Sequence, residues 1–175
     1  DFCLSRGLGD VYKRQVYVYG RETESMEKFS RYISDDYEIE AISGNLKDLS
    51  KVDIICTATP STDALFENHR LKPGVHINAI GSFRPSMREI PNETVINAKV
   101  VVDSFIASKK EAGDLLLTEK ESNWTFDNIY SEIGGIASGR ISGRSNDVEM
   151  TLFKSVGLGF QDLAISELVL DRYDS

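Results

Sequence analysis

Apolar runs and amphipathic stretches alternate along the chain from Val16 onward. The runs rich in β-branched and aromatic residues are typical of strands, and they span residues 16–19, 38–42, 52–58, 75–81 and 99–104. The stretches between them predict helices, at residues 22–34, around 46–49, at 62–66, at 91–98 and, after the last run, up to Lys110. Strands that alternate with helices at this spacing predict an α/β fold built on a parallel, doubly wound sheet.

The remainder of the chain has a different pattern. Residues 115–150 are polar and contain several glycines, so we expect irregular structure there. From residue 155 to 171 the apolar positions return with helical spacing, and Phe160 and Leu163 fall on one stripe. We expect Ser155 to cap the N-terminus of this last helix.

The first fifteen residues do not share this order. DFCLSRGLGDVYKRQ shows neither helical nor strand periodicity, and it resembles translated adaptor sequences at the ends of environmental reading frames. We therefore expect residues 1–15 to be a non-native leader. Gly7-Leu8-Gly9 resembles the start of a phosphate-binding loop, but no strand precedes it, and a strand instead of a helix follows at Val16.

Composition and charge narrow the class of protein. The chain has 175 residues, 41% hydrophobic and 27% charged, as in one globular domain or one domain with part of another. A formal net charge of −8 argues against nucleic acid as a partner, because phosphate binding needs a basic face. No apolar run approaches the ~20 residues that span a bilayer, and no signal peptide opens the chain, so we expect no membrane partner.

Cysteine and histidine are scarce, with two of each in the sequence. Cys3 and Cys56 are widely separated and lack the spacing of metal ligands, so we expect no metal site and a reduced, cytoplasmic setting. Cys56 lies within an apolar run and is expected to behave as a small, inert hydrophobic residue. His76 lies within a predicted strand, and we expect it to be packed and hydrogen-bonded.

A glycine and two charged residues, Gly20-Arg21-Glu22, follow the first strand. In dinucleotide-binding folds, an acid at the end of the second strand binds the ribose 2′-hydroxyl of NAD, whereas a nearby arginine accommodates the 2′-phosphate of NADP. Gly20 offers no carboxylate, Arg21 offers a fork suited to phosphate oxygens, and Glu22 lies one step into the helix. We predict that these residues bind a cofactor, with NADP(H) favoured over NAD(H). The alternative is a glycine turn followed by a solvated arginine.

Two further groups follow strands later in the chain. Thr57-Ala58-Thr59 ends one buried run, and its small side chains let a ribose or pyrophosphate approach the backbone. Ile80-Gly81-Ser82 ends the next, where a glycine lets a flat cofactor ring lie against the backbone. We predict that both groups bind the cofactor. The alternative for the first is an ordinary loop into a helix capped by Ser61 or Thr62.

The head of the last predicted helix, Ser155-Val156-Gly157, is a further candidate. Free backbone N–H groups at a helix N-terminus can hold a carbonyl or carboxamide oxygen, and the alternative is capping alone. Near the substrate we place Arg84, which can meet a carboxylate or pair with Glu89. Asp114 is a weaker candidate for the same region, because charged residues near helix ends are usually solvated.

Seven motifs of the chain together resemble the ornithine cyclodeaminase/mu-crystallin family, in the order in which that family carries them. They are VYGR, VDIICTATPS, LKPGVHINAIGSFRPSMREI, VVVDS, KEAGDL, IYSEIGGIASG and TLFKSVGLGFQDLA, and they cover nearly all of residues 16–170. The resemblance implies an NAD(P)-binding Rossmann domain, a homodimer and an oxidoreductase that acts on amino or imino acids. It also implies that Arg21 binds the adenine-side ribose or its phosphate and that Thr57–Thr59 line the cofactor. Ile80 and Gly81 would lie near the nicotinamide, together with Ser155 and its neighbours.

Family members also carry an earlier half that has no counterpart in this sequence. It holds a dimerisation and substrate domain, followed by the first strand and the glycine-rich loop. We therefore expect residues 16–154 to form an N-terminally truncated NAD(P)-binding domain and residues 155–175 a helix that packs on the absent domain. Loss of the central first strand should separate the leading strand pair from the other strands. We expect the chain alone to be poorly stable and inactive, as a fragment of an enzyme about twice as long.

Phe83 bears on the reaction type and, by the same resemblance, lies near the substrate. Family members that cyclise ornithine carry an aspartate at this position, which is thought to handle protons or water during deamination. A phenylalanine exchanges no proton, so the resemblance favours an NAD(P)H-dependent reductase of cyclic imino acids, or ketimines. The alternatives are an ornithine cyclodeaminase with a relocated acid–base group, which makes proline and ammonia and recycles NAD, and a non-catalytic, NADPH-dependent ligand-binding protein of the mu-crystallin kind. Catalytic residues are expected upstream of Val16, so we assign none.

Overall fold

The computed structural model describes residues 15–37 and 39–173. These residues divide into two compact units. The first contains the described residues up to Val52 together with His69–Lys72, and the second contains residues 53–68 and 73–173.

The first unit is a β–α–β arrangement followed by a 3₁₀ helix. Its elements are β1 (Val16–Val18), α1 (Thr23–Tyr37), β2 (Ala41–Ser43) and η1 (Leu46–Lys51). β1 and β2 pair in parallel with Val16 opposite Ala41, and Ile33 of α1 is buried against them. Asn45 and Asp48 cap η1 reciprocally, which satisfies backbone N–H groups at its first turn. The strand–helix–strand order predicted for this segment is therefore confirmed, with shorter strands.

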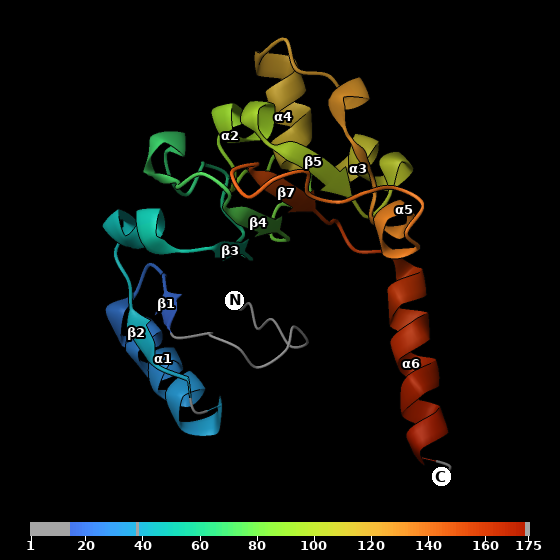
Figure 1. Ribbon diagram of the computed structural model, residues 1–175. Coiled ribbons are helices and arrows are strands. Elements are labelled where there is room, and N and C mark those ends of the chain that lie inside the picture. The colour runs from blue at the N-terminus through green and yellow to red at the C-terminus, as the bar shows by residue number, and fades with distance from the viewer. Residues whose placement is uncertain (1–14, 38, 174–175) are drawn as a thin grey trace. The chain divides into compact units, whose positions relative to one another are not determined.

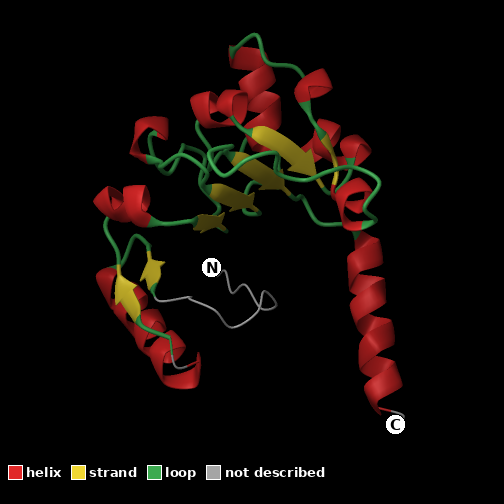
Figure 2. Cartoon of the chain, in the orientation of Figure 1, coloured by secondary structure: helices red, strands yellow, loops and turns green. Residues whose placement is uncertain are grey.

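The second unit is built on a five-stranded parallel sheet with the order β3-β4-β7-β5-β6. The strands are β3 (Ile54–Thr57), β4 (His76–Ala79), β5 (Lys99–Val102), β6 (Ser131–Glu132) and β7 (Thr151–Lys154). The interior strands carry fully buried side chains at Ile77, Val100, Val102 and Leu152. In β4 and β7 these buried positions alternate with half-buried ones, so one face of these strands is covered more fully than the other. The sheet and the β1–β2 pair are separate sheets, which agrees with the expected separation (Figures 1 and 2).

The second unit also contains the helices α2 (Asn92–Asn97), α3 (Phe105–Glu111), α4 (Gly113–Glu121), α5 (Ile133–Ala137) and α6 (Gly159–Tyr173), with the 3₁₀ turn η3 (Phe126–Asn128). A further 3₁₀ turn, η2 (Asn68–Arg70), has residues in both units. Helices α2, α3 and α4 lie together along one side of the sheet (Figure 1). The predicted α/β class with a parallel sheet is confirmed.

Three local predictions were wrong. Residues 62–66 form no helix, because the Ser61 hydroxyl bridges Asp63 in a tight turn. Residues 115–150 are not all irregular, since α4 covers their start and β6 and α5 lie among them. The last helix begins at Gly159, and residues 151–154 form the central strand β7. A four-residue strand that ends on a lysine has no apolar run long enough to reveal it.

Helix α6 carries apolar side chains on all sides. Among them Phe160, Leu163, Leu168 and Val169 are exposed, and no residue of the helix is buried. A helix that is hydrophobic all round normally lies in an interior. Within the described residues, no helix has both the length and the apolar character needed to cross a membrane.

Cys56 departs from the expected inert thiol. It lies half-buried in β3 and is disulfide-bonded. The amide of Asn78 on the neighbouring strand β4 contacts its Sγ at 3.5 Å.

His76 opens β4 and links it to two neighbouring polar groups. Its Nδ1 lies 2.7 Å from the hydroxyl of Thr151 on β7, and its Nε2 lies 3.1 Å from Oδ1 of Asn78. Burial lowers the pKa of His76 below its ordinary value of 6.5, against the opposing effect of Asn78, and the charge of Arg144 adds to the lowering. His76 is thus packed and hydrogen-bonded, as its place in a strand predicts.

The lowered pKa makes stability depend on pH in one direction. Because the unfolded chain binds a proton at His76 before the folded chain does, the free energy of unfolding should fall as pH drops below about 6.5. We expect His76→Gln to flatten this slope between about pH 7 and pH 5.5, above the range where most carboxylates titrate. Urea titrations followed by the fluorescence of Trp124, which is buried in the second unit, measure it. His69→Gln is the matched control, and a slope that persists in His76→Gln but not in the control variant would contradict the assignment.

Candidate functional site

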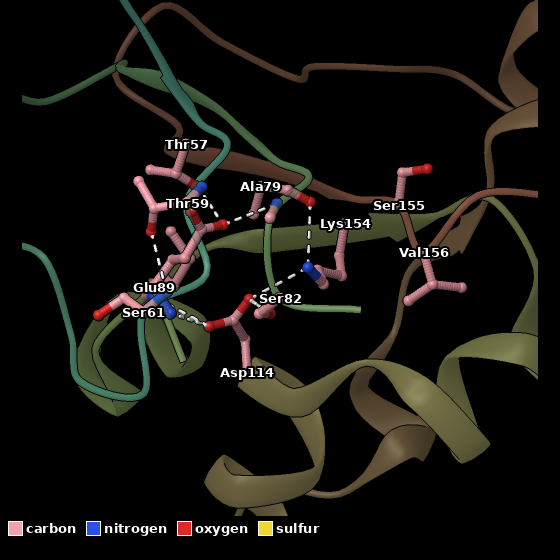
Figure 3. A network of polar contacts seen from close by, with 12 residues as sticks. Thr57, Thr59, Ser61, Ala79, Ser82, Glu89, Asp114, Lys154, Ser155 and Val156 are labelled. Carbon is pink, nitrogen blue, oxygen red and sulfur yellow. Dashed lines mark hydrogen bonds and ion pairs between the residues drawn. The ribbon is translucent and has the colours of Figure 1, made fainter. Parts of the chain in front are cut away.

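The carboxyl ends of β3, β4 and β7 bring three of the predicted groups together. These strands are neighbours in a parallel sheet, so the loops that follow them leave the same edge. We call residues 57–59, 80–82 and 155–157 the carboxyl-edge loops (Figure 3). Ligands of open α/β sheets bind at this edge.

Glu89 joins the first two loops. Its side chain has no exposed surface, and it accepts hydrogen bonds from the Thr57 hydroxyl at 2.8 Å, the Thr59 amide at 2.5 Å and the Gly81 amide at 2.8 Å. All three partners are donors, which suits a carboxylate because both of its oxygens only accept. Glu89 does not pair with Arg84, so one of the two expectations for that arginine is not met.

Asp114, at the start of α4, forms the next link. It accepts from the Ser82 hydroxyl, from the amide of Glu89 at 2.7 Å and from the amide of Ile90 at 2.9 Å. Its side chain has no exposed surface, so it is not a solvated residue near a helix end. The Ser82 hydroxyl points to the same carboxylate and is buried (Figure 3).

Lys154, the last residue of β7, completes the buried cluster. Its Nζ lies 3.2 Å from Asp114 Oδ2 and donates to the carbonyl oxygen of Ala79 at 3.2 Å. It has no exposed surface. Burial lowers the pKa of Lys154, while the charge of Asp114 and the hydrogen bond to it act in the opposite direction. The ammonium therefore ties β7 to β4 and to α4 (Figure 3).

Asp103, directly after β5, holds the third loop. Its Oδ2 accepts from the Ser155 hydroxyl at 2.7 Å, the Val156 amide at 2.8 Å and the Gly157 amide at 3.1 Å. Two expectations are thereby corrected. Ser155 does not cap α6, which begins four residues later, and the amides of this loop are not free, because the carboxylate already occupies them.

The exposed part of the edge is apolar. Ile80 and Phe83 are each 45% exposed, although both follow a buried strand. The guanidinium of Arg84, itself exposed, lies 5.4 Å from the centre of the Phe83 ring. An apolar surface beside an arginine is suited to a flat ring or a small carboxylate ligand.

The remaining predicted group lies in the other compact unit. Gly20, Arg21 and Glu22 are exposed between β1 and α1, and Glu22 accepts from the Ser25 hydroxyl at 3.2 Å. The residues described include no cluster of histidine, cysteine, aspartate and glutamate side chains suited to a metal ion.

Sequence reasoning missed Glu89, Asp103 and Lys154 as members of this site. Glu89 lies in a loop with no periodicity, and Lys154 lies in an unrecognised strand. Of the three, only Asp103 could have been identified from the sequence. It directly follows an apolar strand, and ligands bind at the carboxyl ends of such strands.

Close packing at Gly81 yields a test of this geometry. A Cβ at Gly81 would overlap the backbone of Thr59 and the Glu89 carboxylate, and backbone atoms cannot move aside. We expect Gly81→Ala to lower the free energy of unfolding by about 1–3 kcal/mol, as overpacking does. Gly134→Ala in α5 is the control, because a Cβ there meets nothing within 4 Å and alanine favours helix. Urea unfolding followed through Trp124 compares them, and equal stabilities for the two variants would refute the packing argument.

The chain is similar in sequence to known proteins over nearly its whole length. The family model described as "Ornithine cyclodeaminase/mu-crystallin family" matches residues 10–175. A Delta(1)-pyrroline-2-carboxylate reductase of Bacillus cereus (strain ATCC 10987 / NRS 248) is 40% identical over 162 residues, which are 90% of this chain and 49% of that protein. The chain therefore spans about half the length of the curated relatives it matches.

Two solved structures share the fold. The Thermococcus litoralis Delta(1)-pyrroline-2-carboxylate reductase in complex with NADH and L-proline has a TM-score of 0.84 at 32% identity, covering 89% of this chain and 49% of that one. An archaeal alanine dehydrogenase dimer with bound NAD also has a TM-score of 0.84, at 30% identity, covering 90% of this chain and 49% of that one. These structural neighbours are Rossmann-type NAD-binding domains over the matched part. The chain belongs to the ornithine cyclodeaminase/mu-crystallin family.

Proposed function

We propose that this chain is the cofactor-binding half of an NAD(P)H-dependent reductase that converts a cyclic imino acid into an amino acid. The 40% identity with a Delta(1)-pyrroline-2-carboxylate reductase supports this proposal. So does the likeness to a solved reductase that holds NADH and L-proline. The carboxyl-edge loops lie where such a cofactor binds in an open α/β sheet.

The proposed reaction type rests on the side chains found at the exposed edge. Phe83 stands where ornithine-cyclising relatives are expected to have an aspartate, and its ring exchanges no proton. The three carboxylates near the loops, Glu89, Asp103 and Asp114, are buried and engaged in hydrogen bonds with donors of this chain. None of the three is placed to serve as the relocated acid or base of a cyclodeaminase, which favours reduction.

The residues of this edge fit a nicotinamide cofactor. Bound there, the cofactor would supply the hydride, and the chain would supply its position. Ile80 and Phe83 offer exposed apolar surface against which a flat ring can lie. Arg84 is exposed beside them and can hold the carboxylate of an imino acid. Holding ring and substrate in one geometry is the main requirement of hydride transfer.

Two further parts of the proposal concern domains and assembly. We assign residues 1–15 to a non-native leader and residues 16–154 to a partial NAD(P)-binding domain. We assign residues 155–175, which include α6, to a segment that packs on a preceding dimerisation and substrate domain. The exposed apolar side chains all round α6 support this docking. A homodimer is proposed by analogy with the archaeal alanine dehydrogenase dimer.

The direct test begins with the DNA upstream of the Val16 codon. We expect a reading frame that encodes a strand, a glycine-rich loop and a preceding domain. The longer protein should oxidise NAD(P)H with Delta(1)-pyrroline-2-carboxylate, followed by absorbance, and yield L-proline in step. Proline and ammonia formed from L-ornithine with NAD would instead establish a cyclodeaminase, and cofactor binding without turnover would favour a binding protein of the mu-crystallin kind. A true start codon before an uninterrupted leader would refute the proposed half-enzyme.

Cofactor preference has its own test. We propose NADP(H) over NAD(H), because Gly20 offers no carboxylate to a 2′-hydroxyl and Arg21 is exposed beside it. In the longer protein, Arg21→Gln should raise the Kd for NADPH about tenfold or more, as expected for loss of a hydrogen bond to a charged group. The Kd for NADH should change little. Fluorescence titration measures both constants. An equal rise in the Kd for NADPH and the Kd for NADH would contradict the proposed preference for NADP(H).

A further inference from the structure

We propose that Glu89 is a positioning residue for the cofactor, which fixes the loops after β3 and β4 so that they present an apolar face and no anion-binding amides. This inference rests on the proposed function, because it names how the same edge receives the nicotinamide end of the cofactor. It gives a role to a buried carboxylate that the expected site did not include.

Glu89 joins the two loops through both of its carboxylate oxygens. Oε1 accepts from the Thr59 amide at 2.5 Å, whereas Oε2 accepts from the Thr57 hydroxyl at 2.8 Å and the Gly81 amide at 2.8 Å. One carboxylate therefore fixes the end of β3 and the residue that follows β4 by two. A shift of either loop alone would break at least one of these three hydrogen bonds.

Glu89 is itself anchored. Asp114 accepts from the backbone amides of Glu89 and Ile90, at 2.7 Å and 2.9 Å. Lys154 pairs with Asp114 and donates to the carbonyl oxygen of Ala79, which ends β4. The contacts thus form a closed circuit from β4 through Gly81, Glu89, Asp114 and Lys154 back to β4 (Figure 3).

The hydrogen bonds to Glu89 also determine which groups the two loops offer to a ligand. Backbone amides after a strand commonly bind phosphate or carboxylate groups. Here the amides of Thr59 and Gly81 already donate to Glu89, so they are not available to an anion. The surface left open includes the side chains of Ile80 and Phe83. The two loops are thereby matched to an uncharged ring, and the negatively charged groups of cofactor and substrate must find partners other than these two amides.

The substitution Glu89→Gln tests this role in the longer protein. A glutamine places one NH₂ group where a carboxylate oxygen was, so the amide of either Thr59 or Gly81 faces a donor. We expect the Kd for the reduced cofactor to rise about tenfold, the change that loss of one hydrogen bond to a charged group produces. The KM for the cyclic imine at saturating cofactor should change less than twofold, and hydrogen exchange should accelerate at residues 59 and 81. A merely structural role would lower the melting temperature and the active fraction without changing the Kd.

Two other variants complete the test. Glu121→Gln makes the same chemical change at an exposed carboxylate that pairs with Arg88 and Asn92, and it should leave the Kd unchanged. If Glu89→Gln does not fold, Thr57→Val replaces it, since this change keeps the shape and both amide bonds and removes only the third donor. We expect Thr57→Val to raise the Kd by about two- to threefold, at the lower end of the effect of one hydrogen bond.

The outcomes separate this inference from the proposed function. If wild-type protein neither reduces a cyclic imine nor binds NAD(P)H, the proposed function fails, and hydrogen exchange at residues 59 and 81 still reports whether Glu89 holds the loops. If wild-type protein is active but Glu89→Gln, or Thr57→Val in its place, leaves the Kd unchanged, the positioning role is overturned and the function stands.

Discussion

The ion pair between Lys154 and Asp114 lies in the interior of the second unit, and the arrangement of the edge depends on it. Removing two charges from water costs several kcal/mol per ion, and their attraction offsets this only when the remaining hydrogen bonds are made. Asp114 meets that condition with the Ser82 hydroxyl and two backbone amides, and Lys154 does so with the carbonyl oxygen of Ala79. Burial lowers the pKa of Lys154, and the charge of Asp114 opposes this lowering. Loss of either partner would leave one charge buried alone.

Much of the fold was predictable because its strands are apolar runs bounded by turns. Residues 16–18, 54–57, 76–79 and 99–102 all lie within predicted runs, and the parallel α/β class follows from their spacing. β7 was not predictable in the same way, because it ends on a lysine. Only the tertiary structure shows that Lys154 is buried in an ion pair with Asp114. Helix α4 begins at a glycine and carries three successive leucines, which gives no clear helical period.

The candidate site shows a similar division. The groups at residues 57–59, 80–82 and 155–157 were found because ligands gather at the carboxyl ends of parallel strands. Sequence alone could not show that their amides are occupied. Glu89 is 32 residues from Thr57 along the chain, and Asp103 is 52 residues from Ser155. Contacts at such separations depend on the strand order, and that order includes the strand that was missed.

The capture of backbone amides by Glu89 and Asp103 bears on how this edge can diverge in evolution. A loop held through its own N–H groups keeps its course whatever side chains it carries, provided that they fit. Positions such as Ala58, Ile80 and Val156 can therefore change without loosening the frame beneath them, whereas Gly81 cannot. Selection could then change which ring or carboxylate ligand a descendant binds by exchanging a few outward side chains. Glu89 and Asp103 would remain unchanged beneath them.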